Sequence, residues 1–297
     1  MTVILFFIGF FLITKGADFF INSTVDVGKK LNISELILGA TIVSFATTLP
    51  ELTVSTLASI KGHTTVLGLV SFISPFKVDK KMFLSKSIVL LTSISTLILL
   101  GMDKKISRID GVILLLICIF YIYSNYRSVS NNSVKNQKNN LENQGASFWI
   151  KTFIFFLLGL FMMILGSKTL VDNGIKIAEF IGIPQGIISL TVIALGTSLP
   201  ELVSSLTAIK KNCHSLCVGN VLGANILNIV SVIAISSIPN NIPVLAQSTK
   251  IDFPFMIVLL LSLIIPTMFT KKVSRFQGLI LLMIYFTYIS FLSFIYI

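Results

Sequence analysis

Two glutamates lie in the middle of long apolar runs of this sequence. Glu51 belongs to the motif TTLPEL (Thr47–Leu52), and Glu201 belongs to TSLPEL (Thr197–Leu202), 150 residues later. A carboxylate at bilayer depth costs several kcal/mol unless it faces a partner or a water-filled cavity, so it indicates function by default. Because the motif occurs twice, we expect both glutamates to bind a cation rather than to be protonated, purely structural side chains.

The residues around the glutamates offer neutral oxygen ligands. Pro50 and Pro200 each remove one helix N–H and crowd the carbonyl four residues earlier, which belongs to Ala46 or Gly196. Two carboxylates with backbone and hydroxyl oxygens suit Ca²⁺, which takes about six to eight oxygen ligands. Neither motif holds a thiolate or an imidazole, which disfavours zinc and copper. The hydroxyl residues beside the freed carbonyls are Thr47, Thr48, Thr197 and Ser198.

A second group of polar side chains lies in the segment GNVLGANILN, residues 219–228. Asn220, Asn225 and Asn228 place three amides within an otherwise apolar span. Gly219 and Gly223 form a G-x-x-x-G pair, which is typical of closely packed membrane helices. The segment therefore predicts ion binding, close helix packing or both.

Composition identifies the class of protein that must position these residues. The chain has 297 residues, of which 54% are hydrophobic and only 12% are charged, with a net charge of +11 and a mean hydropathy of +0.94. These values exclude a soluble enzyme, a disordered chain and a secreted disulfide scaffold. The basic residues are scattered, which argues against nucleic-acid binding. We find no nucleophile–base pair, phosphate loop or cofactor motif, so we expect neither an enzyme nor a cofactor.

The apolar runs predict an all-α polytopic membrane protein in two halves. A spanning helix needs about 20 mostly apolar residues, and one further run, Thr64–Phe76, is too short to cross a bilayer fully. A polar linker over residues 128–147 separates a first membrane repeat (1–127) from a second (148–297). The nine full-length runs cover about 2–21, 36–60, 83–102, 109–126, 148–170, 186–209, 214–238, 253–270 and 276–296.

The two halves repeat each other. A shift of 150 residues lays Ile37–Lys61 on Ile187–Lys211 without a gap, with 10 identities in 25 positions. Internal duplication with helix breakers inside hydrophobic segments is typical of secondary transporters. If the short run also crosses, each half has five spans, and an odd number makes the halves inverted copies. We therefore predict about ten transmembrane helices in two inverted five-helix repeats, the third helix being truncated.

The basic residues predict the orientation of these spans. With the N-terminus outside and ten crossings, 16 of the 23 basic residues lie inside and 7 outside. If the short run does not cross, the split becomes 9 inside and 14 outside. Because loops on the cytoplasmic side carry the excess of Lys and Arg, ten crossings are favoured, and the central linker is expected in the cytoplasm.

The paired motifs and GNVLGANILN resemble the sodium/calcium exchangers of the cation/calcium antiporter superfamily, especially its compact prokaryotic members. The resemblance covers nearly the whole chain and implies a bacterial inner membrane location. It also implies that the second and seventh helices are broken near the glutamates. By the same resemblance, calcium is coordinated by Glu51 and Glu201 with the carbonyls of Thr47 and Thr197, sodium is held in part by Thr48 and Ser198, and Asn228 is a site residue on the eighth helix.

The first half departs from the family pattern in length. Pro239 follows Glu201 by 38 positions, whereas Pro75 follows Glu51 by only 24, so the first half has an apparent deletion of 14 positions. The missing part is the asparagine-bearing counterpart of residues 219–228. Ala46 stands where the family usually has glycine, and Ala224 stands where it often has a serine of the binding site. The chain is thus expected to be a shortened member of the family.

These observations favour an antiporter that exports calcium in exchange for sodium. Its expected partners are the two ions and the lipid bilayer, with no nucleic acid and no obligate protein partner. Two alternatives stay open. The same glutamates could couple cation exchange to protons, because carboxylates can be protonated, or the chain could be a relic that keeps the fold without transporting.

Overall fold

The structure is a computed structural model that describes residues 1–31, 33–48, 66, 68–136, 146–183, 188, 196 and 198–296. Within these residues, seven helical segments are long and apolar enough to cross a membrane. The helices that make up these segments are α1 (Thr2–Leu31), α5 (Lys80–Leu100), α6 (Arg108–Asn136), α7 (Ala146–Phe180), α11 (His214–Leu227), α13 (Phe253–Thr270) and α14 (Arg275–Tyr296).

Shorter elements complete the described chain. α2 (Glu35–Leu38), the π-helix η1 (Gly39–Val43) and α3 (Ser44–Thr48) form one short apolar helix, and α10 (Leu199–Lys210) leads into α11. The π-helix η5 (Asn228–Ile233) and α12 (Ala234–Ser237) continue α11. The remaining elements are η3 (Gly101–Asp103), η6 (Ser248–Asp252) and the strands β1 (Phe76–Lys77), β2 (Lys105–Ile106), β3 (Ile242–Pro243) and β4 (Lys272–Val273).

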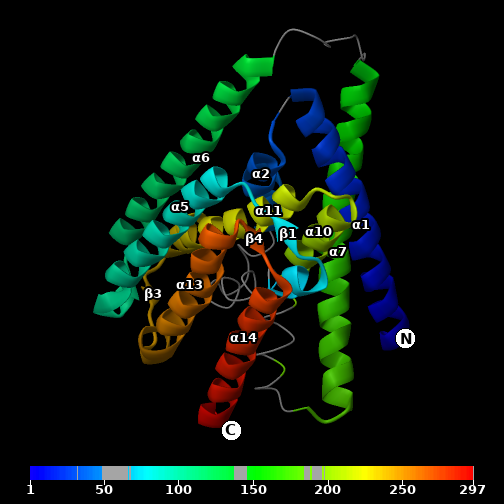
Figure 1. Ribbon diagram of the computed structural model, residues 1–297. Coiled ribbons are helices and arrows are strands. Elements are labelled where there is room, and N and C mark those ends of the chain that lie inside the picture. The colour runs from blue at the N-terminus through cyan, green and yellow to red at the C-terminus, as the bar shows by residue number, and fades with distance from the viewer. Residues whose placement is uncertain are drawn as a thin grey trace.

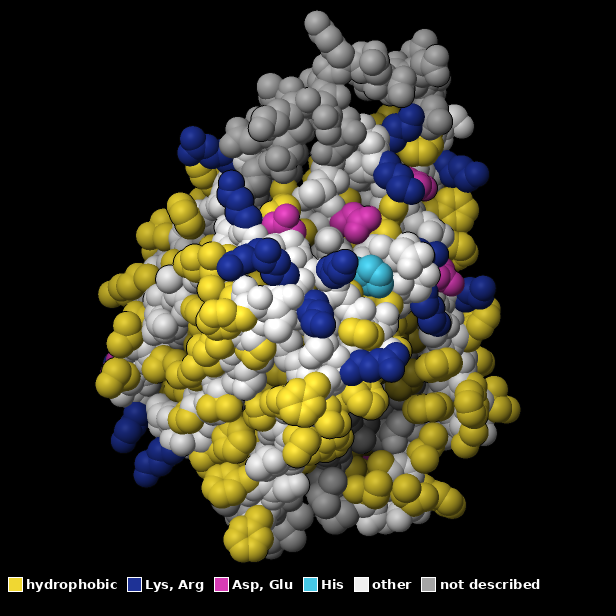
Figure 2. All heavy atoms as spheres, viewed as in Figure 1, with side chains coloured by type: hydrophobic (Ala, Val, Ile, Leu, Met, Phe, Trp, Pro, Cys, Tyr) yellow, Lys and Arg dark blue, Asp and Glu magenta, His cyan; other side chains and the backbone are white. Residues whose placement is uncertain are grey.

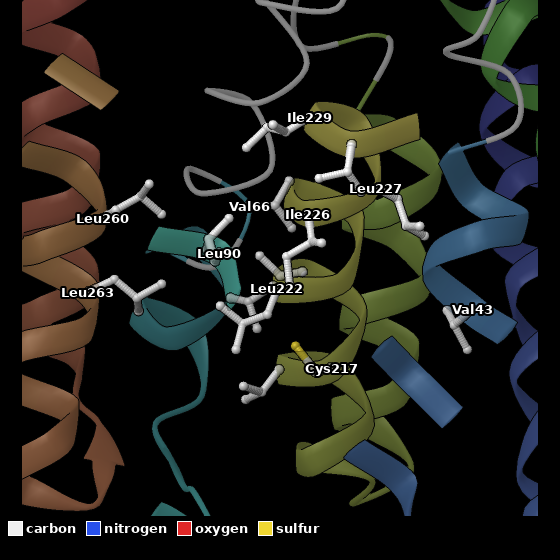
Figure 3. Close-up of a cluster of buried hydrophobic side chains, with 14 of the residues drawn as sticks. Val43, Val66, Leu90, Cys217, Leu222, Ile226, Leu227, Ile229, Leu260 and Leu263 are labelled. Carbon is white, nitrogen blue, oxygen red and sulfur yellow. The ribbon is translucent and has the colours of Figure 1, made fainter. Parts of the chain in front are cut away.

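α11 lies at the centre of the molecule (Figure 1), with α1 and α7 on one side and α5, α6 and α13 on the other. In the span His214–Ser237, 94% of the apolar 18-residue stretch is buried inside the protein, against 17% in the span Ser147–Phe180. Leu222 and Ile226 of α11 lie in a cluster of buried apolar side chains that also includes Leu90 of α5 and Leu263 of α13 (Figure 3). The apolar core is therefore built around α11.

The outer surface is strongly apolar. Many phenylalanine, isoleucine and leucine side chains on α1, α6, α7 and α14 are exposed, as expected of helices that face lipid. Figure 2 shows most basic side chains of this face gathered in its upper part, above a band of hydrophobic side chains. The molecule is an integral membrane protein.

Helices α1 and α7 pack through two glycine contacts, and each contact joins the residues that are equivalent to those of the other. Gly9 lies against Gly166, and Gly16 lies against Gly159. A Cβ atom on Gly16 would lie 2.7 Å from the carbonyl oxygen of Gly159, and one on Gly166 would lie 2.8 Å from that of Gly9. Gly9 and Gly159 are 150 residues apart, as are Gly16 and Gly166. The shift that aligns the motifs therefore also exchanges the two contacts.

A second internal repeat, not aligned by the shift of 150, lies at the starts of α6 and α14. KKISRIDG (Lys104–Gly111) and KKVSRFQG (Lys271–Gly278) align at a shift of 167 in residue number. Their first lysines both adopt left-handed backbone conformations, with φ of 67° at Lys104 and 53° at Lys271. The strands that follow these lysines pair across the halves, because β2 pairs with β3 and β4 pairs with β1, both antiparallel.

The glycines that end these two segments, Gly111 and Gly278, show which helix of the second half corresponds to the short helix around Ser71 in the first half. Gly111 packs on Ser237 of α12, and Gly278 packs on Ser71 and on the carbonyl of Gly68. The helical residues around Ser71 thus take the place of α12, and the shift from Ser71 to Ser237 is 166 in residue number. The shift between equivalent residues is 150 at the glutamate motifs and 166 at these serines, so 16 residues of the second half have no counterpart in the first. This is two more than the 14 indicated by the spacing of glutamate and proline in each half.

Several predicted boundaries are wrong by ten or so residues. α1 extends past the predicted end at 21 to Leu31, and α7 extends past 170 to Phe180. At 1.5 Å per residue, the 30-residue α1 is about 45 Å long, more than the ~30 Å hydrocarbon core. Hydropathy shows only the part in lipid, so it misses the polar ends. α6 likewise continues to Asn136, so residues 128–136 of the predicted linker are helical.

Candidate cation-binding site

A hydrogen-bonded network joins three helices around the second glutamate motif. Thr47, at the end of α3, donates from Oγ1 to Oδ1 of Asn220 on α11 at 3.5 Å. Nδ2 of Asn220 donates to Oγ of Ser204 at 3.0 Å and to Oγ of Ser205 at 3.2 Å, both on α10. Ser204 donates to the backbone carbonyl of Glu201 at 3.0 Å. The structure thus brings Thr47, Asn220 and the helix of Glu201 together.

Glu201 occupies the first turn of α10. The helix begins at Leu199 with Pro200 in its first turn, where a missing N–H leaves no helix bond unmade. The side chain of Glu201 is fully buried. The partial positive charge of a helix N-terminus stabilises a carboxylate in this position.

The hydroxyl groups of Thr48 and Ser198 are buried at the same place in the two motifs. Their exposed fractions are 4% and 1%, and neither hydroxyl has a hydrogen-bond partner among the described residues. Ser198 is the N-cap residue of α10, yet its side chain makes no capping bond. Because a buried hydroxyl without a partner is costly, these two oxygens are suited to contact a bound ion.

One carbonyl expected to be free accepts a hydrogen bond. The carbonyl of Gly196, four residues before Pro200, accepts from Oγ of Ser167 on α7 at 3.1 Å. Ser167 thus uses one lone pair of this oxygen, and the second lone pair is left for a ligand. Ser167 could not be singled out from the sequence, because serines are common in membrane helices; Ala17 stands 150 residues before it and has no hydroxyl.

The glycines of residues 219–228 place α11 directly against α2, η1 and α3. A Cβ atom on Gly219 would overlap the carbonyl oxygen of Leu36, and one on Gly39 would overlap that of Leu216. A Cβ atom on Gly223 would lie 2.5 Å from Oγ of Ser44. This close approach lets the Asn220 side chain reach Thr47, so the packing and polar roles of this segment occur together.

The other two predicted amides are also buried. Asn225 donates from Nδ2 to the carbonyl of Val221 within its own helix at 2.9 Å, and Asn228 begins the π-helix η5. Both side chains are at most 1% exposed. The remaining predicted ligands, Glu51 and Thr197, lie outside the described residues.

The described residues hold no group of three or more His, Cys, Asp or Glu side chains that could bind a metal ion. Cys213, Cys217 and His214 do not form such a group: the thiols are free, and the His214 ring stacks on Phe76 at 5.9 Å. Burial raises the pKa of Cys213 to about 11, so the thiol stays protonated at neutral pH. The candidate site is instead one of hard oxygen atoms, which suits alkali and alkaline-earth cations.

Membrane-length helices around a buried carboxylate and its hydroxyl and amide partners define an integral membrane protein of the ion-transporter class. A family model described as "Sodium/calcium exchanger protein" matches residues 1–66 and 151–294. The chain belongs to this sodium/calcium exchanger family.

Similar proteins support the assignment over the whole length. The chain is 32% identical to an uncharacterized membrane protein of Methanocaldococcus jannaschii, covering 94% of both chains. It is 25% identical to the sodium/calcium exchanger MaX1 of Methanosarcina acetivorans, covering 97% of both chains. Its structure is similar to that of the sodium-calcium exchanger NCX_Mj soaked without sodium and calcium, with a TM-score of 0.81, 29% identity and 98% of both chains covered.

Proposed function

We propose that this protein exports calcium in exchange for sodium by alternating access. The observation that carries the proposal is the fully buried Glu201 at the start of α10, joined through Ser204 and Asn220 to Thr47 on α3. A buried carboxylate among neutral oxygens can bind a cation and release it when the surrounding helices move. Membership of the sodium/calcium exchanger family supports this assignment.

We infer a ligand set that is shared between the two motifs. Two carboxylates, Glu51 and Glu201, match the charge of one Ca²⁺ ion. The hydroxyls of Thr48 and Ser198 are neutral ligands suited to Na⁺, which is singly charged. The set is completed by the backbone carbonyls of Thr47 and Thr197 and by the amides of Asn220, Asn225 and Asn228.

We propose that the halves are inverted five-helix repeats, ten helices in all. The exchanged contacts of Gly9 with Gly166 and of Gly16 with Gly159 support a two-fold relation, because equivalent residues meet twice in such an arrangement. The strand pairs β1–β4 and β2–β3 support it in the same way. In inverted-repeat transporters, rocking of one repeat against the other gives alternating access.

We propose a bacterial inner membrane location with the N-terminus outside and the linker in the cytoplasm. The pairing of β1 with β4 brings Lys77 and Lys272 together, and both belong to loops predicted to be cytoplasmic. The other pair joins Lys105 to Pro243, in loops predicted to be outside. The upper gathering of basic side chains in Figure 2 and the lower position of the N-terminus in Figure 1 agree with this orientation.

One structural observation favours a second candidate, a non-transporting relic. With shifts of 150 and 166, a block of 16 residues in the second half has no counterpart in the first; with the gap placed after Thr65 the block is residues 216–231, which include the three asparagines of α11 and η5. Proton-coupled exchange by the same glutamates is a further alternative.

Calcium uptake into proteoliposomes tests the proposal. Purified protein is reconstituted, and ⁴⁵Ca²⁺ uptake is measured with an outward sodium gradient, with a proton gradient and with neither. Sodium-driven uptake that Glu201→Gln abolishes would support sodium/calcium exchange. Uptake driven only by protons would establish the proton-coupled alternative, and calcium binding without flux would establish the relic.

A further inference from the structure

Lys86 is a buried cation in the membrane-spanning helix α5. Its ammonium donates a hydrogen bond to Oδ1 of Asn125 on α6. It also lies over the ring of Tyr121, with Nζ 5.4 Å from the ring centroid, a cation–π distance. Among the described residues, no carboxylate oxygen lies within 4.0 Å of the Lys86 ammonium; the salt bridge found among them joins Lys211 to Asp18 instead. Burying an ammonium group with only these two neutral partners is costly, so the position of Lys86 indicates a functional role.

Tyr121 connects this lysine to the helix that carries the first motif. Its hydroxyl donates to the backbone carbonyl of Ala40 at 2.5 Å. Ala40 lies in the π-helix η1, where the N–H of Ser44 bonds to the carbonyl of Gly39, five residues back. The carbonyl of Ala40 therefore does not receive its usual partner from Ser44, and the Tyr121 hydroxyl supplies a bond instead. π-Turns of this kind are frequent at functional sites.

The second half has a tyrosine and a residue of opposite charge at the equivalent positions, but they contact each other differently. Tyr288 stands ten residues after Gly278, as Tyr121 does after Gly111, and Asp252 follows Lys86 at the same shift of 166 that relates Ser71 to Ser237. The Tyr288 hydroxyl donates to Oδ1 of Asp252 at 2.8 Å. Equivalent tyrosines thus donate to a carboxylate in one half and to a backbone carbonyl of the motif helix in the other.

We propose that Lys86 and Tyr121 are positioning residues for cation binding. Lys86 and Asn125 fix the Tyr121 ring, Tyr121 holds the Ala40 carbonyl, and the resulting π-turn orients α3 with Thr47 and Thr48. The inference rests on the proposed function, in which these two threonines contact the transported ion. The first half lacks the asparagine-bearing block, so its remaining ligands depend more on the helix that carries them.

Tyr121→Phe removes only the hydroxyl, and Tyr288→Phe is the matched control. Calcium-dependent thermal stabilisation of the purified protein gives a half-saturating Ca²⁺ concentration for each variant. We expect Tyr121→Phe to raise it about threefold to tenfold, on the order of one hydrogen bond, with a loss of melting temperature without calcium similar to that of Tyr288→Phe. Tyr288→Phe should change the half-saturating concentration less than about twofold.

Lys86→Met, Lys86→Arg and a double variant complete the test. Lys86→Met should weaken calcium binding as Tyr121→Phe does, and the double variant should be no weaker than either, because the two residues act in one chain of contacts. Lys86→Arg, which keeps the charge, should restore most of the affinity. If Tyr121→Phe does not fold, Lys86→Met and Lys86→Arg give the same comparison.

The outcomes separate this inference from the proposed function. An original protein without any calcium response would overturn both. A normal response that Tyr121→Phe leaves unchanged, or that Tyr288→Phe weakens equally, would overturn the positioning role alone. A Lys86→Met variant that loses thermal stability but keeps its calcium affinity would show a purely structural lysine and would also overturn it.

Discussion

The hydroxyl of Thr47 lies 3.5 Å from the amide oxygen of Asn220, although 173 residues separate them in the chain. This contact links the first motif to the segment of the second half that has no counterpart in the first. Asn220 also bonds to two serines of α10, so one amide connects three helices. The site depends on Asn220 for its shape as well as for an oxygen atom.

Replacing Asn220 with leucine should therefore weaken calcium binding more than a single lost ligand would. The change removes all three bonds of this amide; Thr47 and Ser204 keep their bonds to backbone carbonyls, and each buried group left unsatisfied costs about 1–3 kcal/mol. We expect at least a tenfold rise in the half-saturating Ca²⁺ concentration and a lower melting temperature, measured by calcium-dependent thermal shift. A variant with unchanged affinity would show that the network is remote from the ion.

Glu201→Gln keeps the shape of the side chain and removes one negative charge. Calcium affinity should fall at least tenfold, about 1.4 kcal/mol, in ⁴⁵Ca²⁺ binding to the purified protein. Glu179→Gln is the control, because Glu179 lies on the exposed end of α7. Equal affinities in the two variants would remove Glu201 from the site.

Gly219→Ala should destabilise the protein through packing alone. Its Cβ atom would overlap the carbonyl of Leu36, and a backbone atom cannot turn away as a side chain can. Gly101→Ala is the matched control, since the nearest atoms there are 3.6 Å away and φ is −81°. We expect a loss of several degrees in melting temperature for Gly219→Ala and about 1 degree or less for Gly101→Ala.

Adding the missing block should improve exchange more than calcium binding. The contacts of Ser71 and Ser237 set the length of the gap at 16 positions, and we place it after Thr65, opposite residues 216–231. Inserting a copy of residues 216–231 after Thr65 supplies the absent amides and lengthens the truncated span. Sodium-driven ⁴⁵Ca²⁺ uptake in proteoliposomes should rise, because sodium relies more on neutral oxygens. If the unmodified chain already exchanges as fast as a full-length relative, the gap has no functional cost.

The sequence predicted the centre of the site better than its surroundings. Glu201, Pro200 and Asn220 could be found because a carboxylate, a proline and an amide are each exceptional in an apolar run. Ser204 and Ser205 could not, because serines are common in membrane helices and only the crossing of α10 and α11 turns them toward Asn220. Lys86 lies within the predicted run 83–102 but could not be singled out, since its burial depends on packing against α6, which hydropathy does not predict.

The duplication was also only partly visible in the sequence. A single shift of 150 residues aligns the motifs around Glu51 and Glu201, but it does not align Lys104–Gly111 with Lys271–Gly278. The later helices are recognisable as a repeat through the matching contacts of Gly111 and Gly278. Packing therefore supplies the register that the length difference between the halves hides.

The strand pair β1–β4 has a consequence for how the chain is made. Phe76 pairs with Val273, so the first half cannot complete its contacts until almost the whole protein has been synthesised. At about 5–20 residues per second, this delay is roughly 10–40 s. During that interval the early helices wait in the bilayer without their final neighbours, and a ribosome that stalls before residue 273 leaves a fragment that the quality-control proteases of the membrane can recognise.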